Sequence, residues 1–223
     1  MNSYKGRIHE HAWDLSPREA SALQNELAKQ VVREIQSGEI ATVAGIDVGI
    51  RSGVSRAAVV VLDYPGLETV KYATATRPLT FPYIPGLLSF REGPVILDAL
   101  HKLSSAPDLL VFDGQGVAHP RRLGIASHIG LLVDVPSIGC AKSRLCGRYE
   151  EPGLERGSHV PLMDKGEIIG SVVRTRSGVK PVFVSVGHRL DLQTSVDYVL
   201  ACCRGYRLPE TTRRAHLMAS KIR

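Results

Sequence analysis

The sequence predicts an α/β fold in which a mixed central sheet is flanked by helices. Three strand-like runs, rich in Val, Ala and Thr, follow one another at residues 42–50, 56–63 and 68–77. The short turns between them contain Gly or Pro and predict an antiparallel meander. Further along the chain, apolar runs alternate with helical segments, which favours parallel strands that continue the same sheet.

The first element is expected to be a helix that begins after Ser16. Ser16 and Glu19 have the spacing of a capping box, and Pro17 suits the first helical position. Apolar residues then recur at helical spacing as far as Ile35, before Gly38. We therefore expect one amphipathic helix that packs through a single apolar stripe.

A loop at residues 81–86 precedes a helical segment at residues 87–103. Pro94 is expected to split this segment into a short leading turn and a main body, because proline suits the first turn of a helix and disrupts its interior. Glu92 would then lie at the break.

The second half of the chain continues the alternation of strands and helices. A strand is expected at residues 108–113, a helix at 121–133 and a short strand at 137–139. Later strands are expected at residues 160–162, 168–175 and 181–186, and later helices at residues 191–203, capped by Asp191, and 209–222. An antiparallel meander continued by parallel strands, with acids on the first and fourth strands, is the pattern of a ribonuclease H-like fold.

The size of the chain suits one domain. Its 223 residues and 24.2 kDa predict a single domain over residues 1–223, with an irregular or flexible segment at residues 1–15. No run approaches the roughly 18 apolar residues that cross a bilayer. The first residues lack the apolar core of a signal peptide. We therefore expect a cytoplasmic protein without a membrane partner, and we expect a monomer.

The charge of the chain favours a polyanionic partner. The net charge is +6 and the pI is near 9.3, which makes a nucleic acid a reasonable partner without proving one. The cysteines lack the spacing of a zinc site, and we interpret all of them as free thiols: Cys140, Cys146, Cys202 and Cys203.

Two aspartates end short apolar runs that are expected to be buried strands. Asp47 follows Ala-Gly-Ile, and Asp113 follows Leu-Leu-Val-Phe. A carboxylate costs several kcal/mol to remove from water unless a cation offsets its charge. Two such carboxylates at strand ends indicate a shared divalent metal, although either one alone would also suit a turn.

Four ordered blocks stand out between about residues 44 and 218. They read PYIPGLLSFRE at residues 82–92, DGQGVAHPRRLG at 113–124, SIGCAK at 137–142 and GYRLPE at 205–210. Together they closely resemble the endonuclease V family. Blocks of this length and order are far more specific than an isolated short motif.

The resemblance implies a ribonuclease H-like fold and a magnesium-dependent endonuclease, with Mn²⁺ as a substitute for Mg²⁺. Such an enzyme recognises deoxyinosine, which is deaminated adenine, in DNA. It hydrolyses the second phosphodiester bond on the 3′ side of the lesion and leaves a 3′-hydroxyl and a 5′-phosphate. The chain would therefore act in DNA repair by incision.

The resemblance also assigns catalytic residues. Asp47 and Asp113 match the family's principal metal ligands, and Glu92 matches its third carboxylate. His216 falls where the family carries His or Asp, so it either binds the metal or orients water. Lys142 would place a positive charge near the scissile phosphate. Without the resemblance, the glutamate and the lysine would more simply be surface residues.

The loop at residues 81–86 suits a wedge that enters stacked DNA. Its prolines stiffen a tip formed by Pro82, Tyr83 and Ile84, and a weakly paired base costs least to turn out of the helix. The alternative is a loop whose apolar residues fold onto the core. His119, Arg121 and Arg122 are candidates to contact the DNA backbone, with backbone positioning as the alternative for the histidine.

A pocket for the damaged base would have to distinguish hypoxanthine from adenine. Hypoxanthine carries a carbonyl oxygen and an N1–H where adenine has an amine and a bare N1. By analogy with the family, the candidate lining residues are Leu88, Gly114, Gly116, Gly139 and Leu145. Gly114 and Gly116 could equally serve only the tight turn after their strand.

Two other functions fit the same sequence. One is an endonuclease that acts on inosine in single-stranded RNA, because the metal chemistry is indifferent to the 2′-hydroxyl unless a side chain excludes it. The other is a nucleic-acid-binding module without catalytic activity. The sequence disfavours the second because every carboxylate position holds a residue that can bind a metal.

Overall fold

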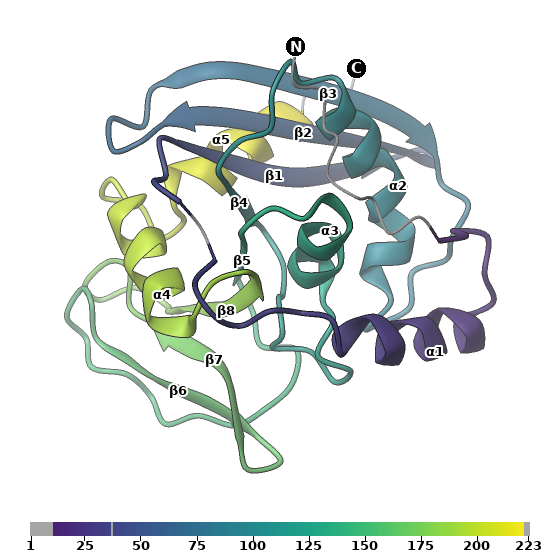
Figure 1. Ribbon diagram of the computed structural model, residues 1–223. Helices are drawn as coiled ribbons and strands as arrows, with labels where there is room; N and C mark the ends of the chain where they lie inside the picture. The colour runs from purple at the N-terminus through teal and green to yellow at the C-terminus, as the bar shows by residue number, and fades with distance from the viewer. Residues whose placement is uncertain (1–10, 37, 221–223) are drawn as a thin grey trace.

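The computed structural model describes residues 11–36 and 38–220, and these residues build an eight-stranded sheet flanked by helices (Figure 1). The strands lie in the order β3-β2-β1-β4-β5-β8-β7-β6. Their bounds are β1 Thr42–Arg51, β2 Val54–Asp63, β3 Thr69–Pro78, β4 Leu109–Phe112, β5 Ser137–Ala141, β6 His159–Asp164, β7 Glu167–Val173 and β8 Val182–His188. The helices are α1 Pro17–Ala28, α2 Leu88–His101, α3 Ile125–Val133, α4 Leu192–Ala201 and α5 Glu210–Ala219.

The predicted fold class is confirmed. Strands β1, β2 and β3 form the antiparallel meander, and β4 and β5 continue the sheet in parallel from β1. Strands β8, β7 and β6 then extend it in antiparallel pairing to the far edge. This is the mixed sheet of a ribonuclease H-like fold. None of the helices within the described residues is long and apolar enough to span a membrane.

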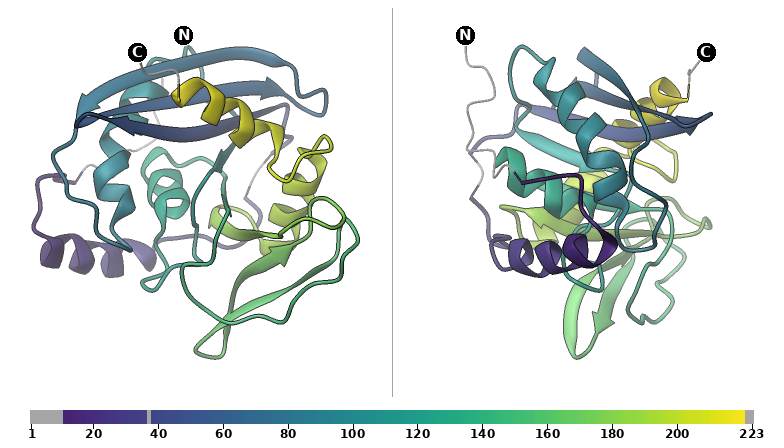
Figure 2. Two further views of the ribbon diagram at one scale, coloured as in Figure 1. Left: turned by 180° about the vertical axis from the view of Figure 1, so that it is seen from behind. Right: turned by 90° about the vertical axis from the view of Figure 1, so that its right-hand side faces the viewer.

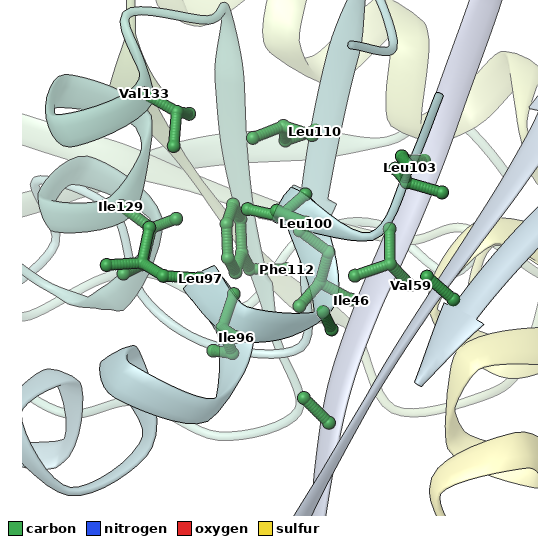
Figure 3. Packing of buried hydrophobic residues seen from close by; sticks show 14 of the residues in the cluster. Ile46, Val59, Ile96, Leu97, Leu100, Leu103, Leu110, Phe112, Ile129 and Val133 are labelled. Atoms are coloured by element: carbon green, nitrogen blue, oxygen red, sulfur yellow. The ribbon is translucent and has the colours of Figure 1, made fainter. Parts of the chain in front are cut away.

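Helices cover both faces of the sheet. Helices α2 and α3 pack on one face, where their apolar side chains meet those of β1 to β4 (Figure 3). Helices α4 and α5 pack on the opposite face. Helix α5 lies behind β1 in Figure 1 and in front of it when the molecule is turned in Figure 2. The side chains on β1 therefore alternate between two helical layers.

Close contact between α5 and β1 depends on Gly45. A β-carbon at this position would lie 1.9 Å from the backbone oxygen of Thr211, inside any possible contact distance. Only glycine allows α5 to pack so closely on the strand. This matters for the rest of the structure because α5 brings His216 to Asp47, in the middle of β1.

Helix α1 is shorter than the sequence predicts. It begins as expected at Pro17, with the capping box of Ser16 in place, but it ends at Ala28. The segment after it pairs with residue 189 instead: the Arg189 amide donates to the oxygen of Val32 at 2.7 Å. These long-range backbone hydrogen bonds replace the helix, and Ile35 is left exposed.

Helix α2 is continuous, so the predicted break at Pro94 was wrong. Pro94 lies inside the helix, and Glu92 lies in the helix body rather than at a break. Proline costs a helix interior about 3 kcal/mol. Burial of each large apolar side chain stabilises the folded state by about 1.5–3 kcal/mol. Helix α2 buries several such side chains, including Phe90, Ile96 and Leu100. The apolar face therefore outweighs the missing hydrogen bond.

Two other boundaries differ from expectation. Helix α3 begins at Ile125 rather than at residue 121, because residues 121–124 form a turn in which Arg122 has a φ of 58°. The last helix begins at Glu210 after its N-cap, Pro209, and ends at Ala219, while Ile222 lies outside the described residues. Asp191 caps α4 as predicted, since its side chain accepts a hydrogen bond from the Thr194 amide at 2.7 Å.

Residues 11–15, which belong to the segment expected to be irregular, form no helix or strand but pack over α2 and α3. The Nε2 atoms of His11 and His128 are 2.8 Å apart, and Nδ1 of His128 lies 2.9 Å from Oγ of Ser89. Trp13 stacks on His128 with ring centroids 5.4 Å apart. Complete burial lowers the pKa of His128 to about 3. Residues 1–10 lie outside the described residues.

Replacing Gly45 with alanine should destabilise the protein by about 1–3 kcal/mol, the usual cost of an added group in a packed interior. The melting temperature should fall by about 2–4 °C for each kcal/mol in a chain of this size. Circular dichroism during heating measures this. Gly38→Ala is the matched control, because a β-carbon at Gly38 meets nothing within 4 Å. Equal melting of the two variants would contradict the close contact between α5 and β1.

Buried His128 should make the protein less stable in acid. Its pKa is about 3 in the folded state and 6.5 ordinarily, so between these values the unfolded chain holds a proton that the fold excludes. The neutral histidine leaves the free energy of unfolding at its full value above pH 6.5. Between pH 6.5 and 3 this free energy falls by up to about 1.4 kcal/mol per pH unit. Urea unfolding between pH 7 and 5 measures how the free energy of unfolding changes with pH. This change should be smaller for His128→Asn than for the parent. His159→Asn, at an exposed position, should keep the parent slope; an unchanged slope in His128→Asn would contradict the account.

Candidate active site

Asp47 and Asp113 meet because β1 and β4 pair in parallel with a fixed register. The last pair in register is Ile46 with Phe112, and the Asp113 amide donates to the oxygen of Ile46 at 3.3 Å. The two aspartates follow these partners directly. Neighbouring strands lie about 4.8 Å apart, so the two carboxylates lie side by side where β4 ends against the middle of β1, which continues beyond Asp47 to Arg51. The predicted meeting of the two residues is confirmed.

Two basic side chains reach these carboxylates from other elements. Nδ1 of His216, on α5, lies 2.7 Å from Oδ2 of Asp47. The ammonium of Lys142, which follows β5, forms an ion pair with Asp113. The aspartates are largely buried, whereas His216 and Lys142 remain partly exposed. The charged groups thus form a cluster that solvent reaches from one side.

Glu92 approaches the same cluster from α2. Burial is the main cause that raises its pKa to about 8, and repulsion from Asp47 and Asp113 adds to it, while Arg91 opposes the shift. Burial likewise raises the pKa of Asp113, although Lys142 opposes this. Burial and the neighbouring carboxylates therefore disfavour the charged forms of both acids in the absence of a cation.

The donors at this site suit a hard divalent cation. Asp47, Asp113 and Glu92 supply carboxylate oxygens, and their mutual repulsion is the kind of strain that a divalent ion relieves. Among the residues that the structure describes, no group of three or more acidic, histidine or cysteine side chains is arranged to hold a metal ion. An open site fits Mg²⁺, which usually keeps several waters and takes one or two carboxylates together with substrate phosphate.

A cavity of about 310 Å³ opens beside the carboxylates. Asp113 and Lys142 form part of its wall, and so do three of the residues expected to line a base pocket: Leu88, Gly114 and Leu145. The two other glycines proposed for the pocket are not among its lining residues.

Gly116 and Gly139 instead allow the backbone to pack closely. A β-carbon at Gly139 would lie 2.2 Å from the amide nitrogen of Gly116. A β-carbon at Gly116 would lie 2.0 Å from the oxygen of Val186. Their role is to let the segment after β4 lie against β5 and β8, rather than to contact a base.

The loop at residues 81–86 forms the rim of the cavity. Tyr83 is 69% exposed, and Pro82 is exposed beside it, as a wedge requires. Ile84 is only partly exposed and packs with Phe81, which is buried against Phe90. The loop thus has a buried apolar base and an exposed tip that consists mainly of Tyr83.

Three side chains hold the end of this loop through one backbone oxygen. The oxygen of Gly86 accepts hydrogen bonds from His119 at 2.9 Å, Arg121 at 2.8 Å and Gln24 at 3.0 Å. His119 donates through Nε2, because its Nδ1 accepts from the Arg121 amide. Burial lowers the pKa of His119 to about 4, so the ring is neutral. These contacts support backbone positioning for His119 and Arg121, which were expected to contact DNA.

The Arg122 side chain also forms ion pairs with other residues of the protein. Its guanidinium pairs with Asp164 at 2.8 Å and with Glu167 at 2.7 Å. It lies in the turn before α3 and joins that turn to the β6–β7 hairpin. The helix start that suggested phosphate binding by Arg121 and Arg122 is absent, and this geometry favours a structural role for both.

The sequence interpretation missed three residues around the site. Gln24 holds Gly86, Gln115 donates to the oxygen of Ser143 at 2.9 Å, and Arg207 donates to the oxygen of Lys142 at 2.6 Å. A polar residue inside the apolar stripe of α1 was the signal for Gln24. Gln115 and Arg207 lie within the blocks DGQG and GYRLPE, but nothing local identified their partners.

Comparison with known proteins identifies the family of this chain. A sequence model of the endonuclease V family matches residues 25–217. Endonuclease V of Roseiflexus sp. (strain RS-1) is 54% identical over 208 residues, which cover 93% of this chain and 94% of that protein. The relative from Methanothrix thermoacetophila is 52% identical over 95% of this chain and 94% of its own.

Solved structures have the same fold. The crystal structure of endonuclease V from Streptomyces avermitilis superposes with a TM-score of 0.89 at 45% identity and covers 97% of both chains. Endonuclease V of Ciona intestinalis, in complex with a 24mer DNA containing an inosine followed by a ribo-adenosine, gives a TM-score of 0.80 at 28% identity, over 92% of this chain and 96% of that one. The chain therefore belongs to the endonuclease V family of nucleases.

Proposed function

We propose that this enzyme recognises deoxyinosine in DNA and, with Mg²⁺, hydrolyses the second phosphodiester bond on the 3′ side of the lesion. The products would carry a 3′-hydroxyl and a 5′-phosphate. The observation that carries the proposal is the pairing of Asp47 with Asp113 directly beside a cavity of about 310 Å³. The inosine-containing DNA bound by the Ciona relative supports the choice of lesion.

The cavity has the size and lining to take one base. Its volume lies at the lower end of the range for small-molecule pockets. Leu88 and Leu145 offer apolar surface, and Gly114 exposes backbone to the cavity without a side chain. Backbone donors and acceptors in fixed positions would favour the carbonyl and N1–H of hypoxanthine over the amine and bare N1 of adenine.

Tyr83 stands at the mouth of this cavity with most of its ring exposed. Such a side chain can enter the stack and fill the space left by a base that has turned out. The three hydrogen bonds to Gly86 hold the base of the loop, so the tip keeps its position. The proposed role of His119 and Arg121 is therefore to fix the wedge.

Cleavage needs positive charge on both sides of the phosphorus. Asp47, Asp113 and Glu92 would hold Mg²⁺, or Mn²⁺ in its place, and the bound ion would supply Lewis acidity and a metal-activated water. Lys142 points its ammonium at Asp113 and borders the cavity, so it would neutralise charge on the scissile phosphate. His216 would orient water or the Asp47 carboxylate through its 2.7 Å contact. The enzyme would act as a monomer in the cytoplasm.

Asp47→Asn should abolish nicking of a DNA duplex with one deoxyinosine, with a loss on the order of 100-fold or more, because a metal ligand is worth several kcal/mol. The assay maps both ends of the product with and without Mg²⁺, and compares an inosine-containing RNA strand. Asp197→Asn, at an exposed position on α4, is the control and should keep full activity. Retained activity in Asp47→Asn would refute the metal assignment, and a much faster reaction on RNA would overturn the choice of DNA.

Tyr83→Ala should weaken lesion recognition more than chemistry. Loss of one stacked aromatic ring corresponds to about 1–3 kcal/mol, so the KM for the deoxyinosine duplex should rise while kcat changes little. Steady-state nicking measures both constants, and competition with undamaged duplex measures selectivity. Tyr72→Ala, which removes a 63% exposed ring on β3, is the control. If Tyr83→Ala keeps the parent KM and selectivity, the wedge role is wrong.

A further inference from the structure

A tyrosine–arginine stack lies beside the carboxylate cluster, on the loop before α5 and the first turn of α5. The guanidinium carbon of Arg213 lies 4.5 Å from the centre of the Tyr206 ring. We propose that this stack, called here the 206/213 platform, binds the base of a nucleotide on the 3′ side of the bond that is cut. The inference rests on the proposed function and adds a binding site for the outgoing strand.

The platform is held rigidly before any substrate arrives. Arg213 donates from Nε and Nη2 to the two carboxylate oxygens of Glu210, each at 2.7 Å. Glu210 is buried and also accepts from Arg214 at 3.2 Å. The guanidinium is thereby fixed over one face of the Tyr206 ring, while the tyrosine remains 53% exposed. A rigid, exposed aromatic ring backed by a cation is a suitable surface for stacking a base.

The platform lies next to the cluster along α5. Arg213 and His216 are three residues apart and share one face of the helix. His216 in turn contacts Asp47 at 2.7 Å. One helical turn therefore separates the platform from the group that contacts a proposed metal ligand.

A second contact ties the same loop to Lys142. Arg207, the neighbour of Tyr206, donates to the oxygen of Lys142 at 2.6 Å, and to that of Pro181 at 2.8 Å. The chain after Lys142 runs along the cavity, since Ser143 and Leu145 line it. None of the described residues of α5 or of the loop before it lines the cavity. Lys142 thus stands between the cavity and the platform.

The order of cavity, Lys142 and platform sets the path of the bound DNA strand. The lesion would occupy the cavity, and the bond to be cut lies on its 3′ side, at Asp113 and Lys142. The strand that continues in the 3′ direction must leave across the side of Lys142 that faces away from the cavity. Tyr206 is exposed and lies on that side, next to the Arg207 that contacts the Lys142 backbone. The platform therefore meets a nucleotide that becomes the 5′ end of the downstream product.

The charge around the platform suits a phosphate backbone. Residues 204–214 contain four arginines and a single acid, Glu210. Arg204 is exposed and donates one hydrogen bond to the oxygen of Pro65. A stacking ring within a positively charged segment is the combination by which proteins hold single strands with little regard for sequence. The expected ligand is accordingly any base, and not a particular one.

The test uses two deoxyinosine strands that differ only beyond the cut. One is intact, and in the other the two nucleotides downstream of the cut bond are abasic tetrahydrofuran residues with normal phosphates. The parent enzyme should lose roughly 5- to 150-fold in kcat/KM on the abasic strand, which corresponds to about 1–3 kcal/mol of stacking. Tyr206→Ala should lose the same factor on the intact strand and little more on the abasic one. Tyr206→Phe should behave as the parent, and so should the control Tyr72→Ala.

Each outcome decides the inference. The platform is refuted if the parent cuts both strands equally well, or if Tyr206→Ala remains as sensitive to the abasic residues as the parent. A similar loss on both strands, with lower thermal stability, would show that Tyr206 only supports α5. If the parent cuts neither strand, the proposed function fails and the platform fails with it. If the parent cuts both strands at equal rates, the platform is refuted while the proposed function stands.

Discussion

The parallel register between β1 and β4 is the constraint on which the site depends. The register pairs Ile46 with Phe112, and this places Asp47 and Asp113 next to each other although they are more than sixty residues apart in the chain. A shift of one residue would turn one carboxylate to the opposite face of the sheet. The buried residues that precede each aspartate oppose such a shift, because it would turn them from one helical layer into the other and disrupt both cores. Core packing thus sets the geometry of a charged site.

The other parts of the site are attached to this pair from separate layers of the fold. Helix α5 reaches it because Gly45 admits the helix against β1, and α2 brings Glu92 from the opposite face of the sheet. Lys142 follows β5, the next parallel strand. The burial of acidic side chains at one place, which raises the pKa of Glu92 to about 8, is unfavourable for their charged forms. The proposed binding of a cation would offset this cost.

Local signals in the sequence predicted much of this structure. The capped start of α1, the three-stranded meander and the cap of α4 all came from neighbouring residues, and the aspartates that follow two apolar runs identified the centre of the site. Features that depend on distant partners were missed or misread. The end of α1 is set by residue 189, and the role of Arg122 is set by Asp164 and Glu167, which lie 42 and 45 positions away. Pro94 was misread because the buried face of α2 outweighs its local effect.

The central claim is that Asp47 and Asp113 together hold a divalent ion at the mouth of the base cavity. Anomalous diffraction from crystals of the enzyme soaked in Mn²⁺ tests it most directly. The account predicts one strong peak in contact with carboxylate oxygens of both residues, adjacent to Lys142. A peak bound elsewhere, or no peak while the two carboxylates keep their positions, would contradict it.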